Sequence, residues 1–245
     1  MKYALKFKSE SPISFPVNYN KILQAAILSW LGNDEAAVFL HDKGYETNKR
    51  KYKLYTFSDI RGQYQYNKAA HRIEFTDEIY IILSFYSDEY ESLIMKNVRD
   101  QRPMIFGTNV VEFSECMQAI EKYQPCIVDT VSPITVHSTF SKTDGSKRTY
   151  YYEPTENDFS EMIRQNLIRK YISYHETEPE NTEFVIKPYN REKLRRIETR
   201  YNGTIIRAWR GSYQIAGSQE LIKMALLSGI GDRNGTGFGC VLQRK

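Results

Sequence analysis

The order of strand-like and helix-like segments constrains the fold of this chain more than any other feature. In the first half, an alternating strand pattern over 3–9 precedes a helix pattern over 20–32, whose apolar residues share one face and which ends at Gly32. A shorter helix pattern follows over 34–44. Three strand patterns then follow over 51–58, 71–75 and 78–87. A helix pattern over 88–100 and a strand pattern over 102–113 complete the half. The resulting order is close to β-α-β-β-α-β.

The second half repeats this order after a changeover near residues 123–125. A strand pattern over 124–137 and a hairpin with Asp144-Gly145 as its turn precede a long helix pattern over 154–175. Three further strand patterns follow, and Ser218 is expected to cap a last helix over 219–228. We therefore predict an α+β fold of two tandem ferredoxin-like (RRM-like) βαββαβ units, 1–122 and 123–245, each an antiparallel sheet with helices on one face.

Composition excludes several classes of protein. The 245 residues are 41% hydrophobic and 26% charged, which is typical of a globular chain with a buried core. The most apolar run, 79–86, is far shorter than the ~20 residues of a membrane helix, and the N-terminus lacks the apolar segment of a signal peptide. Cys116, Cys126 and Cys240 show no CxxC spacing, so we expect reduced structural thiols in a cytoplasmic protein, with no metal site and no cofactor.

Basic residues are concentrated in two segments, although the net charge is only +4. Residues 48–53 hold four basic side chains and no acid, and residues 191–200 hold five basic side chains against two acids. The chain also contains 19 tyrosines. Clustered lysine and arginine with interleaved tyrosine suit a surface that neutralises phosphates and stacks bases. Two solvated basic turns on a neutral surface fit the composition equally well.

A glycine loop, GIGDRNGTGFG over 229–239, holds five of the chain's 13 glycines and stands between the last helix and a final strand pattern. A phosphate-binding P-loop needs Lys-Ser/Thr after its glycines, and a Rossmann loop opens a helix, so both fail on context. Glycines permit close backbone approach and leave N–H groups free for anions. A bend that packs against a neighbouring helix is the alternative.

Three motifs together resemble a known family. The pairs Gly229-Ile230-Gly231 and Gly237-Phe238-Gly239 resemble the C-terminal signature of the RAMP superfamily of CRISPR systems. The segment HDKG at 41–44 followed by KYKLYTFS, and VSPITV at 131–136, are similar to segments of its repeat-RNA-processing endoribonucleases, the "Cas six" type. The resemblance extends over the whole chain in the order of its elements.

The resemblance implies an activity. Such enzymes cut CRISPR repeat transcripts (pre-crRNA) without metal: the 2′-hydroxyl attacks the neighbouring phosphate and leaves a 2′,3′-cyclic phosphate and a 5′-hydroxyl. This chemistry requires a base, an acid and positive charge at the phosphorane. By position, His41 matches the catalytic histidine of the family and Lys53 matches its strand lysine. An imidazole titrates near neutrality, which suits proton transfer.

The third catalytic group is left open by the sequence. The family often carries a tyrosine in the first helix, where this chain has Leu28. Tyr45, Tyr52 and Lys51 are the candidates to replace it. The absent tyrosine keeps a second hypothesis in play, namely a non-catalytic subunit that holds the crRNA in a CRISPR effector complex.

Residues that contact RNA are predicted in the glycine loop, in the two basic segments and on the strand pattern IIRAWRG over 205–211. His71, His137 and His175 match no motif and are expected to be structural or surface residues, and Tyr150, Tyr151 and Tyr152 are expected to pack a hairpin. The resemblance implies binding to pre-crRNA and crRNA and leaves open whether effector subunits or a second copy of the chain also bind. The predicted RNA contacts are Lys49, Arg50, Arg195, Arg196, Arg207, Arg210, Gly229, Gly231, Arg233, Asn234, Gly235, Gly237 and Gly239.

Overall fold

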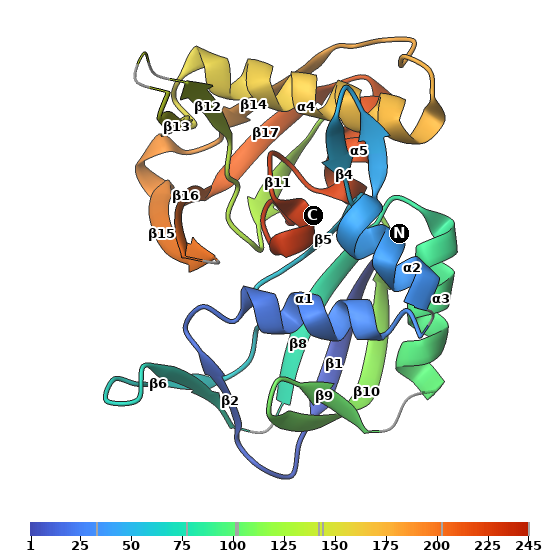
Figure 1. Cartoon of the computed structure of the whole chain (residues 1–245), viewed down its shortest axis with the longest axis vertical. Helices are drawn as coiled ribbons and strands as arrows, with labels where there is room; N and C mark the ends of the chain where they lie inside the picture. The colour runs from blue at the N-terminus through green and yellow to red at the C-terminus, as the bar shows by residue number, and fades with distance from the viewer. Residues whose placement is uncertain are drawn as a thin grey trace.

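A five-stranded antiparallel sheet organises the first half of the chain. The computed structural model describes residues 1–32, 34–76, 78–100, 103–141, 143, 145–201 and 203–244. The sheet has the strand order β5-β8-β1-β10-β9. Its strands are β1 (Lys2–Lys8), β5 (Tyr55–Phe57), β8 (Glu78–Phe85), β9 (Met104–Phe106) and β10 (Asn109–Ala119). In Figure 1 the helix α1 (Asn20–Ser29) crosses the front of this sheet, and α3 (Asp88–Asp100) lies beside it.

A four-stranded antiparallel sheet organises the second half, in the order β14-β17-β11-β18. The strands are β11 (Cys126–Thr130), β14 (Phe184–Pro188), β17 (Ser212–Gly217) and β18 (Val241–Gln243). Two helices, α4 (Asn157–His175) and α5 (Gln219–Ser228), belong to this half. The predicted cap of α5 is confirmed, because the Ser218 hydroxyl accepts a hydrogen bond from the Leu221 N–H at 3.3 Å.

Smaller sheets project from these two layers. β2 (Ile13–Pro16), β6 (Tyr64–Asn67) and β7 (Arg72–Phe75) form a three-stranded sheet at the lower left of Figure 1. β12 (His137–Ser141) pairs with β13 (Lys147–Tyr151), and β15 (Arg195–Tyr201) pairs with β16 (Thr204–Arg210). Short turns of helix occur at η2 (Arg191–Lys193) and η3 (Asn234–Thr236).

A helical segment and a short hairpin connect α1 to β5. The segment consists of α2 (Asp34–Val38) and a single π-helical turn, η1 (Phe39–Lys43). The hairpin pairs β3 (Tyr45–Thr47) with β4 (Arg50–Tyr52). Both residues of its two-residue turn, Asn48 and Lys49, have positive φ, as a type I′ turn requires.

The two halves share their cores. Tyr52, Leu54 and Tyr86 come from the first half but are buried with the apolar side chains of the second. The helix α5 is apolar on almost every side because it packs against β5 and β8 of the first half as well as against β17. Arg210 of β16 forms an ion pair with Asp59, which joins the halves a second time.

Two predicted strands differ from the structure. The segment 102–113 was expected to be one strand but forms the hairpin β9–β10, because Gly107 turns the chain with φ 65°. The segment 51–58 is divided at Leu54, which has φ 50°. Of the predicted hairpin turn in the second half, Asp144 lies outside the described residues and Gly145 has φ 78°. In the described part of the chain, no helix is long and apolar enough to cross a membrane.

Candidate active site

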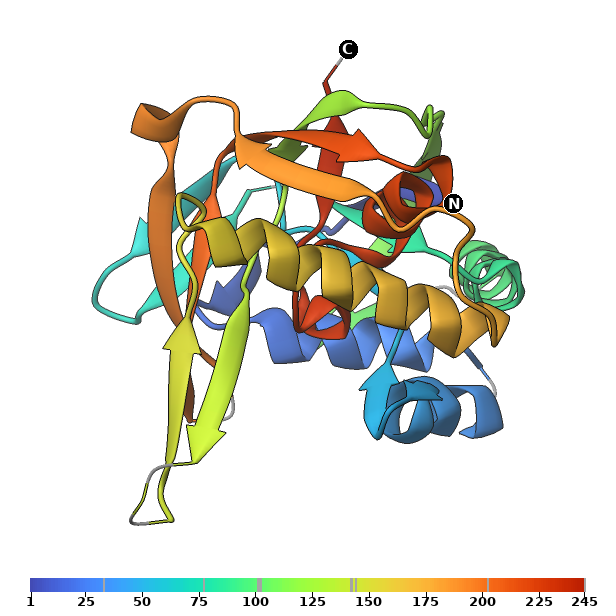
Figure 2. The same ribbon diagram turned by 90° about the horizontal axis from the view of Figure 1, so that it is seen from above.

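A pocket of about 460 Å³ opens between the two halves, with the glycine loop on one side of it. Both views place this loop, drawn in red, between α1 and α4 (Figures 1 and 2). The described residues that line the pocket include five basic side chains and one carboxylate. The lining consists of Gln24, His41, Arg50, Lys51, Tyr52, Lys53, Leu54, His137, Asn166, Lys170, Gly231, Asp232, Arg233, Asn234, Gly235 and Thr236.

His41 reaches the pocket from the π-helical turn η1. Its side chain is 60% exposed, and its Nδ1 lies 2.6 Å from Oδ1 of Asp42. The turn ends at Gly44, where φ is 67° and a Cβ would lie 2.6 Å from the Tyr52 carbonyl oxygen. Gly44 therefore lets η1 lie directly against β4, which brings His41 next to the basic hairpin. π-Helical turns are often found at functional sites.

Lys53 lies beside His41, and its Nζ donates a hydrogen bond to the His41 carbonyl oxygen at 2.6 Å. Partial burial lowers the pKa of Lys53 to about 8, with repulsion from Lys51 acting in the same direction and attraction from Asp42 opposing it. Lys51 donates to the Asp42 carbonyl oxygen at 3.2 Å. The imidazole and two amines predicted from the sequence are thus gathered at one pocket.

The candidates for the third group are separated by the structure. Tyr45 does not line the pocket, because its ring packs among Phe39, Tyr90 and Tyr174, where burial raises its pKa to about 12. Tyr52 does line it, but the residue is mostly buried and its hydroxyl accepts a hydrogen bond from Arg169 Nε at 3.3 Å.

The first helix presents amide side chains to the glycine loop. Leu28 is buried in the core of the first half. Gln24 lies one turn before Leu28 on the same face of α1 and donates to the Gly235 carbonyl oxygen at 2.8 Å. Asn20 lies one turn further toward the N-terminus and donates to the Thr236 carbonyl oxygen at 2.9 Å. The contribution of α1 to this site is therefore to hold the loop in place.

The three sequence motifs meet one another in space. Gly239 donates its N–H to the carbonyl oxygen of Pro133 in the Ser-Pro-Ile segment at 2.9 Å, and Ser132 Oγ accepts from the Cys240 N–H at 3.0 Å. From KLYTFS, Tyr55 donates its hydroxyl to the Gly235 carbonyl oxygen at 3.1 Å, and Thr56 donates to that of Phe238 at 2.9 Å. The motifs thus form one hydrogen-bonded unit under the pocket.

The glycines of the loop serve close packing against the rest of the protein. A Cβ at Gly231 would lie 2.5 Å from the Thr135 carbonyl oxygen, and one at Gly237 would lie 2.6 Å from the ring of Phe57. A Cβ at Gly239 would collide with the Ile230 carbonyl oxygen. Gly231 and Gly235 line the pocket, whereas Gly229, Gly237 and Gly239 are not among its lining residues. Several loop amides, including those of Ile230, Asp232 and Gly239, already donate to protein carbonyls.

Two polar side chains hold the loop from within. Asn234 donates through Nδ2 to the carbonyl oxygens of Ile230 at 3.2 Å and Phe238 at 3.0 Å. Its Oδ1 accepts from Lys170 Nζ at 2.7 Å, and Lys170 also donates to the Gly229 carbonyl oxygen at 2.7 Å. Lys170 is only 3% exposed, and burial lowers its pKa to about 7.

The structure places only two of the predicted arginine and lysine contacts in the pocket lining. Arg50 and Arg233 line the pocket, whereas Lys49 lies in the exposed β3–β4 turn. Arg196 and Arg207 share the carboxylate of Glu198 at 3.0 Å each and line a separate cavity of about 270 Å³ together with Arg148. Arg195 is exposed on β15. Arg210 is paired with Asp59 in the contact between the halves, so its charge is already neutralised.

Seven of the described pocket residues were not predicted from the sequence: Gln24, Leu54, His137, Asn166, Lys170, Asp232 and Thr236. The burial of Lys170 could have been predicted, because Lys170 lies at helical spacing on the same face of α4 as the apolar Ile163 and Leu167. His137 carries no comparable signal. It was expected to be a structural or surface residue, and it lies at the pocket because β12 runs beside the glycine loop.

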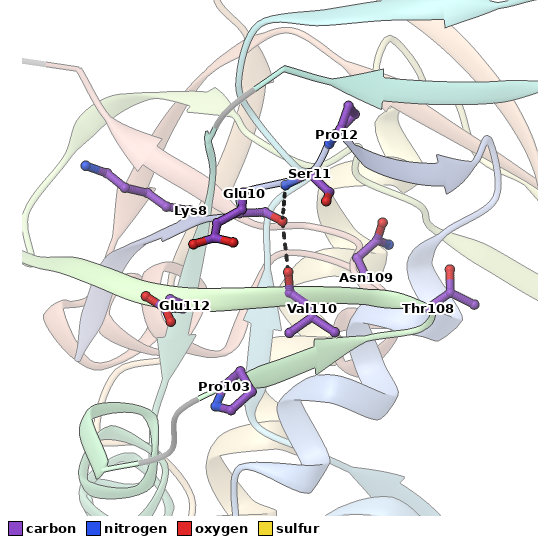
Figure 3. Close-up of a pocket in the computed structure, with 10 residues that line it drawn as sticks. Lys8, Glu10, Ser11, Pro12, Pro103, Thr108, Asn109, Val110 and Glu112 are labelled. Atoms are coloured by element: carbon purple, nitrogen blue, oxygen red, sulfur yellow. Dashed lines mark hydrogen bonds between the residues drawn. The ribbon is translucent and has the colours of Figure 1, made fainter.

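A larger cavity of about 610 Å³ lies at the far end of β1, near Lys8 (Figure 3). Figure 3 shows it between the chain around Glu10 and the hairpin that carries Val110 and Glu112. Its described lining has two carboxylates, one lysine and no histidine. This charge balance does not suit a polyanion, so this cavity is not a candidate RNA site.

Comparison with known proteins agrees with these motifs. The family model described as "CRISPR associated protein Cas6, C-terminal" matches residues 115–242, just over half of the chain. The CRISPR-associated endoribonuclease Cas6 1 of Methanocaldococcus jannaschii is 27% identical over 253 residues, covering 99% of this chain and 92% of that protein.

Two solved structures are similar over the whole chain. One comes from the characterization of a Cas6-related gene from Pyrococcus furiosus, with 20% identity, coverage of 100% of this chain and 98% of the other, and a TM-score of 0.83. The other is an RAMP protein binding different RNA substrates, with 21% identity, full coverage of both chains and a TM-score of 0.81. At these identities the likeness shows a shared mixed α/β fold. The family match over 115–242 shows that this chain belongs to the Cas6 family of CRISPR-associated proteins.

Proposed function

We propose that this protein is a metal-independent endoribonuclease that cleaves CRISPR repeat transcripts. The observation that carries the proposal is the single pocket that gathers His41, Lys51, Lys53 and Arg233 beside the glycine loop. The relative from M. jannaschii is named an endoribonuclease, and one similar structure is described as binding RNA.

The proposed reaction begins at the ribose. His41, exposed at the pocket and next to the Lys53 ammonium, takes the proton from the 2′-hydroxyl. The 2′-oxygen attacks the adjacent phosphorus, which gives a 2′,3′-cyclic phosphate and a 5′-hydroxyl. Lys53 and Lys51 stabilise the negative charge on the phosphorane. The requirement for a 2′-hydroxyl restricts the substrate to RNA.

The charge of the pocket supports binding of a polyanion. Among its described lining residues the pocket has one carboxylate, Asp232, against five basic side chains: Arg50, Lys51, Lys53, Lys170 and Arg233. The Nε of Arg233 is buried and has no hydrogen-bond partner in the described part of the protein. A buried donor without an acceptor is costly, and a small movement of the Arg233 side chain would bring this N–H to an RNA phosphate oxygen in the pocket that Arg233 lines.

We also infer that each half is a ferredoxin-like unit, with the boundary near residue 122. In chain order, the main strands of the first half are β1, β5, β8 and β10, and their spatial order is 2-3-1-4. The strands β11, β14, β17 and β18 of the second half have the same spatial order and are likewise antiparallel. This order is the one expected of a βαββαβ unit.

The second candidate function is a crRNA-binding subunit that does not cut. Leu28 favours it, because the buried leucine stands where the family often has a catalytic tyrosine. Such a protein would use the same basic pocket as a grip for a retained RNA. Effector subunits or a second copy of the chain are further partners that the proposal allows.

The test is cleavage of a repeat RNA in the presence of a metal chelator. We expect the wild-type protein to produce a 2′,3′-cyclic phosphate end, and we expect His41→Asn to cut ~10²–10⁴-fold more slowly. Affinity for an RNA with a 2′-deoxy nucleotide at the cut site should stay the same. His71→Asn is the matched control, since His71 is exposed on the distant β6–β7 turn, where its φ of 50° suits asparagine.

Two outcomes would contradict the proposal. Full-rate cleavage by His41→Asn removes His41 from the mechanism. Tight binding without cleavage by the wild-type protein identifies the crRNA-binding subunit instead.

A further inference from the structure

A second imidazole faces the same pocket from the other half of the molecule. His137 is the first residue of β12 and lines the pocket together with His41, which comes from η1. In both views the glycine loop lies between β12 and the segment α2–η1 (Figures 1 and 2). The two histidines therefore approach the pocket from different sides.

Asp232 of the glycine loop fixes the His137 ring. The ring Nδ1 is buried and lies 2.8 Å from Asp232 Oδ2, so the two form an ion pair whenever the imidazole is protonated. The ring contact is close but lacks hydrogen-bond geometry, and the same oxygen accepts the His137 backbone N–H at 2.9 Å. The side chain keeps 22% exposure. With Nδ1 buried against Asp232, Nε2 is the ring nitrogen left to exchange a proton with a bound substrate.

The carboxylate is itself held in place. Asn166 of α4 donates to its second oxygen at 3.3 Å, and the Asp232 N–H donates to the Thr135 carbonyl oxygen at 2.8 Å. The ring of Tyr151 from β13 packs against His137 with a centroid distance of 5.6 Å. A histidine oriented by a carboxylate, with its other nitrogen toward a cavity, is a recurrent arrangement for proton transfer.

We propose that His137 is the general acid of the cleavage reaction, an inference that rests on the proposed function. As the P–O5′ bond breaks, its electron pair goes to the 5′-oxygen, which takes the proton from His137 Nε2. His41 takes the proton of the 2′-hydroxyl as the new O2′–P bond forms. One proton enters the enzyme and one leaves it, so the step is balanced. Because the 2′-oxygen attacks in line with the leaving group, the base and the acid must lie on opposite sides of the phosphorus. Two histidines that come from different halves of the protein meet this requirement.

The other groups at the pocket suit this role less well. Tyr52 is a buried residue whose hydroxyl accepts a hydrogen bond from Arg169, and Leu28 has no proton to give. Lys51 and Lys53 are bound to backbone carbonyl oxygens beside His41, on the side of the base. His137 lies away from these lysines, and the Asp232 carboxylate beside it stabilises the protonated ring that a general acid requires.

The decisive experiment changes the leaving group. Repeat RNA with sulfur in place of the 5′-oxygen at the cut site releases a thiolate, which is stable enough near neutral pH to leave without a proton, since a thiol has a pKa of only ~8.5. We expect His137→Asn to cut normal RNA ~10²–10⁴-fold more slowly than wild type and to cut the sulfur-substituted RNA at close to the wild-type rate. His41→Asn should be slow on both RNAs.

Each outcome has a distinct meaning. If wild-type protein cuts neither RNA, the proposed endoribonuclease function is wrong. Two results would overturn the role of His137 as general acid while wild type cuts both RNAs. In the first, His137→Asn cuts normal RNA at the full rate. In the second, His137→Asn stays slow on both RNAs. His137→Gln is the second variant in case the first does not fold, and affinity for 2′-deoxy RNA checks the pocket of each. His71→Asn serves again as the control.

Discussion

Two lysines at the pocket differ in what surrounds their amines. Lys53 is half-buried and donates to one carbonyl oxygen, whereas Lys170 is fully enclosed and donates to Gly229 and Asn234. A third acceptor, the Gly231 carbonyl oxygen, lies 3.5 Å from Lys170 Nζ. Burial opposes the charge of both amines and lowers the pKa of Lys170 to about 7 and that of Lys53 to about 8. The protonation of this pocket therefore changes close to neutral pH.

Lys170 links the stability of the protein to pH. Its pKa is lower in the folded chain than in the unfolded chain, so above about pH 7 the unfolded state binds more protons and the free energy of unfolding rises with pH. Between pH 7 and roughly pH 9.5, Lys170 should raise the free energy of unfolding by up to ~1.4 kcal/mol per pH unit, and we expect Lys170→Met to lack this increase. Urea denaturation at several pH values measures it.

The matched control is Lys96→Met, because Lys96 is an exposed lysine on α3. This control should keep the pH dependence of the wild-type protein. Parallel curves for wild type and Lys170→Met would show that the buried amine does not titrate in this range.

At the scale of elements, the glycine loop depends on backbone positions that a side chain cannot occupy. Gly231 has φ 78°, and a Cβ there would lie 2.5 Å from the Thr135 carbonyl oxygen. We expect Gly231→Ala to lower the free energy of unfolding by about 2–5 kcal/mol, from strained φ together with overpacking. Chemical denaturation measures the change.

Gly145 provides a matched comparison for this prediction. Its φ is also 78°, but nothing lies within 4 Å of the Cβ position. Gly145→Ala should therefore cost only about 1 kcal/mol, from the backbone conformation alone. Equal losses in the two variants would contradict the close-packing explanation of the loop.

The sequence predicted elements best where one strong pattern acts locally. The helix α4 and the Ser218 cap of α5 follow from apolar spacing and capping chemistry. The β9–β10 hairpin was missed because the apolar residues on both sides of Gly107 read as a single strand. Predicting the pocket was possible only in part, because His137 meets Asp232 across 95 residues of chain, a contact that no local pattern encodes.

At the scale of the whole molecule, the halves are predicted to fold together. Tyr52, Leu54 and Tyr86 of the first half complete the core of the second, and α5 packs against both sheets. We expect one calorimetric transition for the full chain, with equal calorimetric and van't Hoff enthalpies. A fragment of residues 123–245 should show no cooperative transition, because it lacks these three side chains and exposes α5. Two separate transitions in the full chain would contradict this prediction.

The clamp on Asn234 has a chemical consequence. Asparagine followed by glycine, as here with Gly235, is prone to deamidation, because the next backbone nitrogen can attack the side-chain carbonyl carbon. In the folded protein both ends of this amide are bound, to Ile230, Phe238 and Lys170, and the side chain cannot rotate toward that nitrogen. Unfolding removes this protection. Ageing of the protein in storage should therefore begin in unfolded molecules, and the lesion would fall on the residue that the loop needs in order to reform.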